Sequence, residues 1–296
     1  MLTRLAPTPS GFLHEGNLYN FLCNWLWARV NKGKVLLRID DADASRFRPT
    51  YLDDIFRTLE WMGLDWDLGP SGPDDFMRNW SQSTRMPQYQ QLLFELREKG
   101  LVFACACSRK QLADAGAGTI YPGTCQSKGI LLDAEDVSWR FALPGEGLVF
   151  FEDRWMGKQS IYLKEACGSF LVRRRDGIPA YQVCSLADDA FFGVTHVARG
   201  RDLLVSTASQ ILLASALHKA EFLHTQFMHH PLLLNEQHQK LSKSAGNAIR
   251  LRCAHKEDLH LLLGRFAAFA NLRRSQDPVS LSDLVDLASA WDLIRP

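Results

Sequence analysis

The sequence has no apolar run approaching the roughly 20 residues that a membrane-spanning helix needs. Its first residues, MLTRLAPTPSG, lack the apolar core of a secretion signal. The formal net charge is only +1, so any polyanion must be held by local basic groups. The 7 cysteines, an odd number, cannot all pair within one chain. We therefore expect a reduced, cytoplasmic protein without a membrane segment.

The sequence does contain short apolar strands that alternate with helical patterns over much of its 296 residues. LTRLA and KVLLRI are typical of buried strands, and between them apolar residues recur at helical spacing up to Gly33. Further helices are predicted over about 51–62 and about 87–100. This alternation predicts an α/β protein with a doubly wound parallel sheet of the Rossmann-like class. The ligand site of such a sheet lies at the carboxyl ends of its strands.

The composition and residue pattern of the sequence change between about 101 and 175, where cysteines, glycines and short β-like runs such as LVFFEDRW dominate. That stretch is typical of an insertion into the α/β domain. The predicted regions are 1–100 for the first half of the α/β domain, 101–175 for an inserted subdomain, 176–250 for the second half, and 251–296 for a helical tail.

Two segments carry groups that suit phosphates. PTPSGFLHEGN lies between the first strand and the first helix, where the free N–H groups of a helix start attract anions. Gly16 permits close backbone approach, and His14 can donate to a phosphate oxygen. HQKLSKSAGN, at 238–247, offers Lys240 and Lys243 beside small hydroxyl residues. Either segment alone is more often an ordinary loop, but the pair indicates a phosphate site.

The two segments resemble the HIGH and KMSKS motifs of class I aminoacyl-tRNA synthetases, here HEGN at 14–17 and KLSKS at 240–244. RLAPTPSGFLH, LLRIDDAD, WMGLDWDLGP, AYQVCSLADDAFFGVTHVARGRDLL and KLSKS follow the order found in glutamyl-tRNA synthetases, over most of 1–250. The resemblance is strongest to their short relatives, the glutamyl-queuosine tRNA(Asp) synthetases. It implies a ligase that uses ATP, with Mg²⁺, to convert L-glutamate to glutamyl-adenylate.

The resemblance also implies which residues act on ATP. Negative charge builds on the phosphates during this reaction, so catalysis rests on positioning and on cations, with no protein nucleophile. The implied catalytic residues all bind ATP as well, and Ser242 is implied in ATP binding alone. The positions are His14, Gly16, Asn17, Lys240, Ser242 and Lys243.

A glutamate substrate needs cations for its side-chain carboxylate and an acid for its ammonium group. Arg4 and Arg199 offer planar forks that match a carboxylate, although structural salt bridges are the alternative. Asp40 stands where the family has a glutamate, and Glu15 stands where it has an apolar residue. An acid as close to phosphate as Glu15 is unfavourable unless it points away. The implied glutamate-binding positions are Arg4, Ala6, Thr8, Asp40, Tyr181 and Arg199.

Three cysteines, Cys105, Cys107 and Cys125, lie within a short stretch. Three thiolates make a tetrahedral zinc site that lacks one ligand, which the residues alone leave to water or a neighbour. Three ordinary buried cysteines are the alternative. The spacing C-x-C followed by Y-x-x-x-C resembles the zinc site of the short relatives. It implies Tyr121 as the fourth ligand and one structural Zn²⁺ per chain, inside the inserted zinc-containing subdomain 101–175.

The sequence ends at position 296, soon after KLSKS, where a complete glutamyl-tRNA synthetase continues with a helical anticodon-binding region. The short relatives bind the anticodon loop of tRNA(Asp) in the catalytic cleft and transfer glutamate to queuosine at the wobble position. We therefore expect this transfer, by a monomer. A minimal glutamyl-tRNA synthetase and a non-catalytic paralogue that binds glutamate or RNA are the alternatives. RRR at 173–175 is either a phosphate contact or a solvated turn.

Overall fold

The structure is a computed structural model that describes residues 1–114, 120–233 and 256–289. The chain divides into two compact units. Unit 1 comprises Met1–Gln82, Thr195–Arg201 and Phe227–Pro296, and unit 2 comprises Ser83–Val194 and Asp202–Gln226. None of the described helices is both long and apolar enough to cross a membrane. The predicted boundaries of the insertion, 101 and 175, stay a prediction.

Unit 1 begins with the predicted strand–helix–strand. Strands β1 (Leu2–Leu5) and β2 (Lys34–Leu37) pair in parallel, in the register Leu2 to Lys34. Helix α1 (Glu15–Val30) connects them. The apolar run of β2 is fully buried from its second residue on, as expected of a strand covered on both faces. Parallel pairing across a helical crossover confirms the predicted α/β class.

Two later strands complete the sheet region of unit 1. Strand β8 (His196–Gly200) follows Thr195, whose amide donates to the carbonyl of Leu2 in β1 at 3.0 Å. Strand β9 (Gln226–His230) neighbours β8. Segments far apart in the sequence therefore lie side by side in unit 1, because β8 contacts β1, and the loops after β1, β2 and β8 leave from their carboxyl ends.

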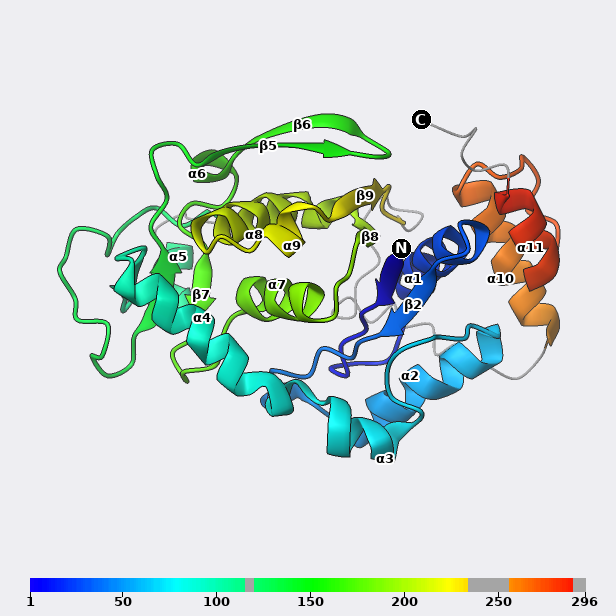
Figure 1. Ribbon diagram of the computed structural model, residues 1–296, viewed down its shortest axis with the longest axis horizontal. Coiled ribbons are helices and arrows are strands. Elements are labelled where there is room, and N and C mark those ends of the chain that lie inside the picture. The colour runs from blue at the N-terminus through cyan, green and yellow to red at the C-terminus, as the bar shows by residue number, and fades with distance from the viewer. Residues whose placement is uncertain (115–119, 234–255, 290–296) are drawn as a thin grey trace. The chain divides into compact units, whose positions relative to one another are not determined.

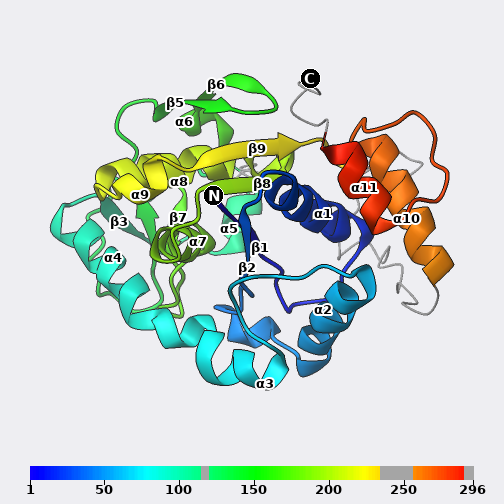
Figure 2. The ribbon, with the colours of Figure 1, turned by 45° about the vertical axis from the view of Figure 1, so that its right-hand side comes forward.

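The other helices of unit 1 include α2, which stops at Gly63 because that residue has the left-handed φ of 69°. Helices α10 and α11 lie together beside α1 in both ribbon views (Figure 1 and Figure 2). Buried residues occur along the whole of α1, which has the sheet on one side and the tail helices on another. The bounds are α2 (Pro49–Met62), α3 (Pro73–Asp75), α10 (Lys256–Phe269) and α11 (Leu281–Ala288).

Unit 2 combines a helical layer with antiparallel strands. Helix α7 packs against both α4 and α8, and α9 follows α8. Strands β3, β4 and β7 form one antiparallel sheet, and β5 and β6 form a hairpin. The helices are α4 (Met86–Glu98), α5 (Arg109–Asp114), α6 (Leu163–Ala166), α7 (Tyr181–Phe191), α8 (Leu204–Ala216) and α9 (Ala220–Leu223). The strands are β3 (Val102–Cys105), β4 (Ser138–Phe141), β5 (Leu148–Asp153), β6 (Gly157–Tyr162) and β7 (Leu171–Arg173).

Candidate active site and metal centre

The start of α1 has the features of an anion-binding helix end. His14 is the N-cap residue with an extended backbone, and its amide donates to Oδ1 of Asn17 at 3.1 Å. A Cβ on Gly16 would lie only 3.1 Å from Nδ1 of His14, so glycine lets the imidazole fold against the first turn. The first amides of a helix have no acceptor within it and can donate to phosphate oxygens. Of the ATP-binding positions predicted here, Asn17 serves as a cap through Oδ1.

Glu15 is turned along α1 rather than over its first turn. The hydroxyl of Tyr19, one turn further along the helix, donates to Oε1 of Glu15 at 2.8 Å. Nε of Arg265 lies 3.0 Å from the same oxygen. The acid that conflicted with a phosphate site in the sequence therefore has a hydrogen-bond donor and a cation as partners.

Most of the predicted glutamate-binding positions belong to unit 1 and stand at or near strand ends. Arg4 is on β1 and Arg199 on β8, and both are 3% exposed. Ala6 and Thr8 follow β1. The guanidinium carbon of Arg199 lies 5.1 Å from the ring centroid of Phe227, a cation–π contact that holds the group over the ring. Two buried cations in one unit suit the binding of an anionic substrate.

Asp40 is oriented by Arg38, a residue that the sequence argument missed. Nε and Nη2 of Arg38 donate to the two carboxylate oxygens at 2.7 and 3.0 Å. The amide of Asp40 also donates to the carbonyl of Pro7 at 2.9 Å, which joins this loop to the one after β1. A carboxylate oxygen has further lone pairs, so Asp40 can still accept from an ammonium group. The two-residue spacing along an extended chain is the signal that could have revealed Arg38.

The remaining predicted positions lie in unit 2 or outside the described residues. Tyr181 is the first residue of α7 in unit 2 and is 43% exposed. Lys240, Ser242 and Lys243 lie outside the described residues. Their roles stay predictions.

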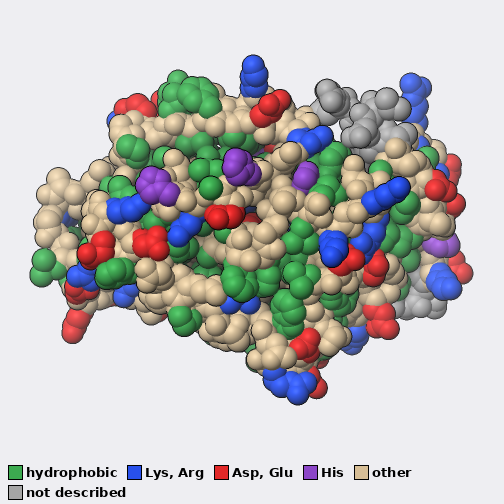
Figure 3. Space-filling view, in the orientation of Figure 1, with side chains coloured by type: hydrophobic (Ala, Val, Ile, Leu, Met, Phe, Trp, Pro, Cys, Tyr) green, Lys and Arg blue, Asp and Glu red, His purple; other side chains and the backbone are tan. Residues whose placement is uncertain are grey.

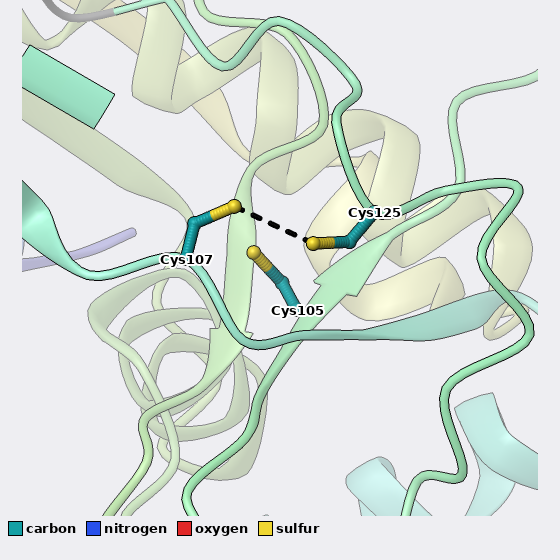
Figure 4. A group of neighbouring side chains, drawn as sticks. All are labelled: Cys105, Cys107 and Cys125. Carbon is teal, nitrogen blue, oxygen red and sulfur yellow. Dashed lines mark hydrogen bonds between the residues drawn. The ribbon is translucent and has the colours of Figure 1, made fainter. Parts of the chain in front are cut away.

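The three cysteines meet in unit 2, as predicted (Figure 4). Their Sγ atoms all lie within 4.8 Å of one another, and those of Cys107 and Cys125 are 3.4 Å apart. Sulfur atoms bound to one tetrahedral zinc ion at about 2.3 Å lie about 3.8 Å apart, so this spacing fits a metal. Cys105 and Cys125 are buried, and none of the three is in a disulfide. The group could hold a metal ion.

Tyr121 belongs to the same cluster. Its hydroxyl accepts from the amide of Cys125 at 2.9 Å and also hydrogen-bonds to Cys105. The guanidinium carbon of Arg140 lies 3.8 Å from the centre of the Tyr121 ring. The phenol oxygen is therefore placed beside the sulfur atoms, which fits its implied role as a fourth ligand.

The thiols of the cluster differ in acidity. Burial would raise the pKa of Cys105, but hydrogen bonds from Tyr121, from the Cys107 backbone and from Arg140 outweigh it and lower the pKa to about 7. Burial and the neighbouring thiols raise the pKa of Cys107 to about 11. The negative charge of one ionised thiol disfavours ionisation of the next one. A bound cation would offset this negative charge, so the cluster is suited to a metal ion.

The basic run at 173–175 contacts this cluster and its sheet. Arg173 lies over the ring of Trp139 at 5.0 Å, and Arg174 pairs with Asp176 at 2.7 Å. Arg175 pairs with Asp136 at 2.7 Å and donates to the carbonyl of Ala106, between two of the cysteines, at 2.5 Å. These contacts favour a structural role over a phosphate contact. On the face drawn in Figure 3, acidic and basic side chains are interspersed among the described residues.

Comparison with known proteins agrees with this geometry. The family described as tRNA synthetases class I (E and Q), catalytic domain, matches residues 1–274. A protein from Symbiobacterium thermophilum named Glutamyl-Q tRNA(Asp) synthetase is 39% identical across 99% of this chain and 92% of its own length. One of the same name from Pseudomonas putida is 42% identical across 81% and 76%. The chain belongs to this class I synthetase family.

A solved member of the family shares the fold. The crystal structure of glutamate-tRNA synthetase from Elizabethkingia anophelis has a TM-score of 0.76 at 23% identity. The match covers 96% of this chain and 65% of that one, so the chain spans just under two thirds of the longer synthetase. The comparison confirms the predicted synthetase catalytic-domain fold.

Proposed function

We propose that the protein activates L-glutamate with ATP and transfers it to queuosine at the wobble position of tRNA(Asp). The observation that carries the proposal is the burial, in unit 1, of Arg4 on β1 and Arg199 on β8. These two strands contact each other, and both contact helix α1, which begins directly after His14. Relatives named for this activity, which match 99% and 81% of the chain, support it.

In the activation step the protein needs to stabilise charge, and no protein nucleophile takes part. The α-carboxylate of glutamate attacks the α-phosphorus of ATP, and the bond to the departing pyrophosphate breaks. His14 and the amides at the start of α1 hold the phosphates, and Lys240 and Lys243 neutralise the pyrophosphate as it leaves. Magnesium enters as part of the nucleotide substrate. In the second step a hydroxyl of the queuosine diol attacks the carbonyl carbon of the adenylate, and AMP leaves.

Glutamate is recognised by paired charges. Arg199 and Arg4 bind the side-chain carboxylate. The family resemblance adds Ala6, Thr8 and Tyr181 as further glutamate-binding positions. Asp40, oriented by Arg38, binds the ammonium group. Arginine forks offer only donors, so they match a carboxylate and not the amide nitrogen of glutamine.

The metal is proposed to be one structural Zn²⁺ per chain, held by Cys105, Cys107, Cys125 and Tyr121. Thiolates and a nearby phenol oxygen form a donor set that zinc accepts. The bound ion would join the C-x-C segment, which begins at the last residue of β3, to the segment that carries Tyr121 and Cys125. Elemental analysis of the purified protein measures it.

The second candidate is a minimal glutamyl-tRNA synthetase that charges the acceptor end, since the catalytic fold matches that of a glutamate-tRNA synthetase. Both candidates share the activation step and differ in the acceptor. We place the protein in the cytoplasm, where ATP and tRNA are found, and propose a monomer, which sedimentation would check.

Exchange of labelled pyrophosphate into ATP tests the activation step. The protein is assayed without tRNA, with glutamate or with glutamine. Exchange that depends on glutamate is the expected result, because Arg4 and Arg199, the proposed partners of the glutamate carboxylate, are part of the protein itself. Exchange driven by glutamine would contradict the substrate, and exchange that needs tRNA would contradict tRNA-free activation.

A further inference from the structure

Glu15 and Arg265 stand 250 positions apart in the sequence and meet on two helices of unit 1. Glu15 is the first residue of α1 and follows His14 directly, and Arg265 is in α10. The Glu15 side chain is 16% exposed and that of Arg265 is 44% exposed. Tyr19 donates to the same carboxylate oxygen as Arg265. The three residues form a charge cluster at the start of α1, called here the helix-start clamp.

Aromatic contacts hold α10 on α1 independently of this ion pair. The ring of Tyr19 lies 5.2 Å from those of both Phe266 and Phe269, centre to centre. Phe266 is fully buried. The ring of His230, at the end of β9, lies 6.1 Å from that of Phe269. A partly exposed ion pair contributes at most about 1 kcal/mol to stability, so the aromatic packing supplies most of the attachment.

The ion pair affects the local charge at the start of α1 more than it affects the attachment of α10 to α1. A carboxylate at the first position of a helix lies within the zone where the helix end attracts anions. An ATP phosphate bound there would meet a second negative charge at close range, and the two would repel each other. Tyr19 keeps the carboxylate along the helix, and Arg265 supplies the opposite charge.

We propose that Arg265 is a positioning residue that neutralises Glu15 and so keeps the start of α1 able to bind the phosphates of ATP. The inference rests on the proposed role of the HEGN segment in ATP binding. It assigns a function in the nucleotide site to a residue of the tail, outside both signature motifs. It also explains how this chain can carry an acid at a position where phosphate binding disfavours one.

Four variants test the clamp: Arg265→Gln, Arg265→Lys, Glu15→Gln and the double variant Glu15→Gln with Arg265→Gln. Lys256→Gln is the control, because it removes one positive charge from an exposed residue of the same helix. For each protein the ATP dissociation constant is measured by titration. The KM for ATP and kcat come from glutamate-dependent pyrophosphate exchange, and thermal melting is recorded.

Arg265→Gln should raise the ATP dissociation constant and KM by about three- to tenfold while kcat stays near the parent value. Arg265→Lys should largely restore ATP binding, since it keeps the charge. The double variant should bind ATP nearly as well as the parent, because the charge that Arg265 offsets is gone. Lys256→Gln should behave as the parent.

Salt provides a second readout that a merely structural role would not move. The difference in ATP affinity between parent and Arg265→Gln should shrink when the salt concentration is raised from about 0.1 M to about 1 M, because the Debye length then falls from about 10 to about 3 Å. The proposal is overturned if the double variant is as impaired as Arg265→Gln, or if Arg265→Gln binds ATP like the parent.

The failure of this inference is distinguishable from failure of the proposed function. A parent protein that binds ATP but shows no glutamate-dependent exchange contradicts the proposed function. The ATP titrations of the variants still test the proposed role of Arg265 in that case. A parent that activates glutamate normally, with Arg265→Gln unaffected, contradicts the clamp alone. A parent that does not bind ATP contradicts both.

Discussion

Arg85 and Asp188 form a two-point ion pair inside unit 2, with Nε–Oδ1 at 2.8 Å and Nη2–Oδ2 at 3.2 Å. Asp188 is fully buried, and the Arg85 side chain is 6% exposed. Tyr89 donates to the same carboxylate at 2.6 Å. Burial, followed by the charge of Asp188, raises the pKa of Tyr89, so its hydroxyl stays protonated as a donor. The pair joins α7 to the residue before α4, and α7 begins at the predicted substrate residue Tyr181.

We expect Asp188→Ala to lower the free energy of unfolding by about 3–5 kcal/mol, because it leaves the Arg85 cation buried without its counter-ion. Urea denaturation measures the change. Asp176→Ala removes the carboxylate of a partly exposed pair with Arg174 and should cost below about 1 kcal/mol. Equal losses in the two variants would contradict the importance of the buried pair.

The metal centre gives a second prediction. Purified protein should contain one zinc per chain, and Cys107→Ser should lose it and lower the melting temperature. A serine hydroxyl does not ionise near neutral pH and so replaces a thiolate ligand poorly.

Cys167→Ser is the matched control for the metal. Cys167 is half-buried, and its thiol donates to the carbonyl of Gly168 at 3.3 Å, outside the three-cysteine group. This variant should keep its zinc. A parent protein that contains no zinc, and melts the same after treatment with a chelator, would show that the cysteines are only core residues.

The pH dependence of stability is predicted at Asp67. Burial would raise the pKa of this carboxyl, but the Val35 amide at 2.8 Å and Arg29 at 2.9 Å outweigh it and hold the pKa below its usual 3.8. A lowered folded-state pKa contributes stability that is present above the usual value and is lost as pH falls through the folded value. Asp67→Asn should therefore be less stable than the parent near pH 7.

The stability difference between parent and Asp67→Asn should narrow as pH falls below about 4, because the parent carboxylate then takes up a proton. Urea midpoints for the two proteins across this range measure it. Asp53→Asn, which changes an exposed acid of the same unit, should follow the parent throughout. A difference that stays constant with pH would mean that the Asp67 charge is not the stabilising feature.

The sequence was sufficient to predict the features that depend on local spacing. The apolar runs of β1 and β2 and the helical period of α1 are set by neighbouring residues, and the structure confirms all three elements. The convergence of Cys105, Cys107 and Cys125 was also predictable, since metal-binding spacings are short. The family resemblance is confirmed by the comparisons.

Contacts between distant elements were not predictable in the same way. Glu15 with Arg265, and Arg85 with Asp188, are brought together by the packing of helices, and no period in one sequence reveals such pairs. From the sequence alone, the acid Glu15 conflicted with a phosphate site at the start of α1. Its contacts with Tyr19 and Arg265 in the structure resolve this conflict. The contact of Arg38 with Asp40 is local, and the spacing of two residues could have revealed it, although the sequence argument missed it.

Arg199 gives the prediction on substrate choice. Arg199→Ala should weaken glutamate activation by about 2–5 kcal/mol, the cost of truncating one partner of a buried charge pair. Arg199→Lys should restore little, since it keeps the charge and loses the fork. Pyrophosphate exchange with glutamate measures the loss, and ATP affinity, which should stay near the parent value, is the internal control. Full activity of Arg199→Ala would place the glutamate pocket elsewhere.

Transfer of labelled glutamate to tRNA(Asp) tests the central claim most directly. The protein is incubated with ATP, labelled glutamate, and tRNA(Asp) that either carries queuosine or lacks it. After nuclease digestion the label is mapped. The account predicts label on the wobble nucleoside of the queuosine-containing tRNA alone. Label on the terminal adenosine, or equal labelling of both tRNAs, would contradict it and favour an acceptor-end synthetase.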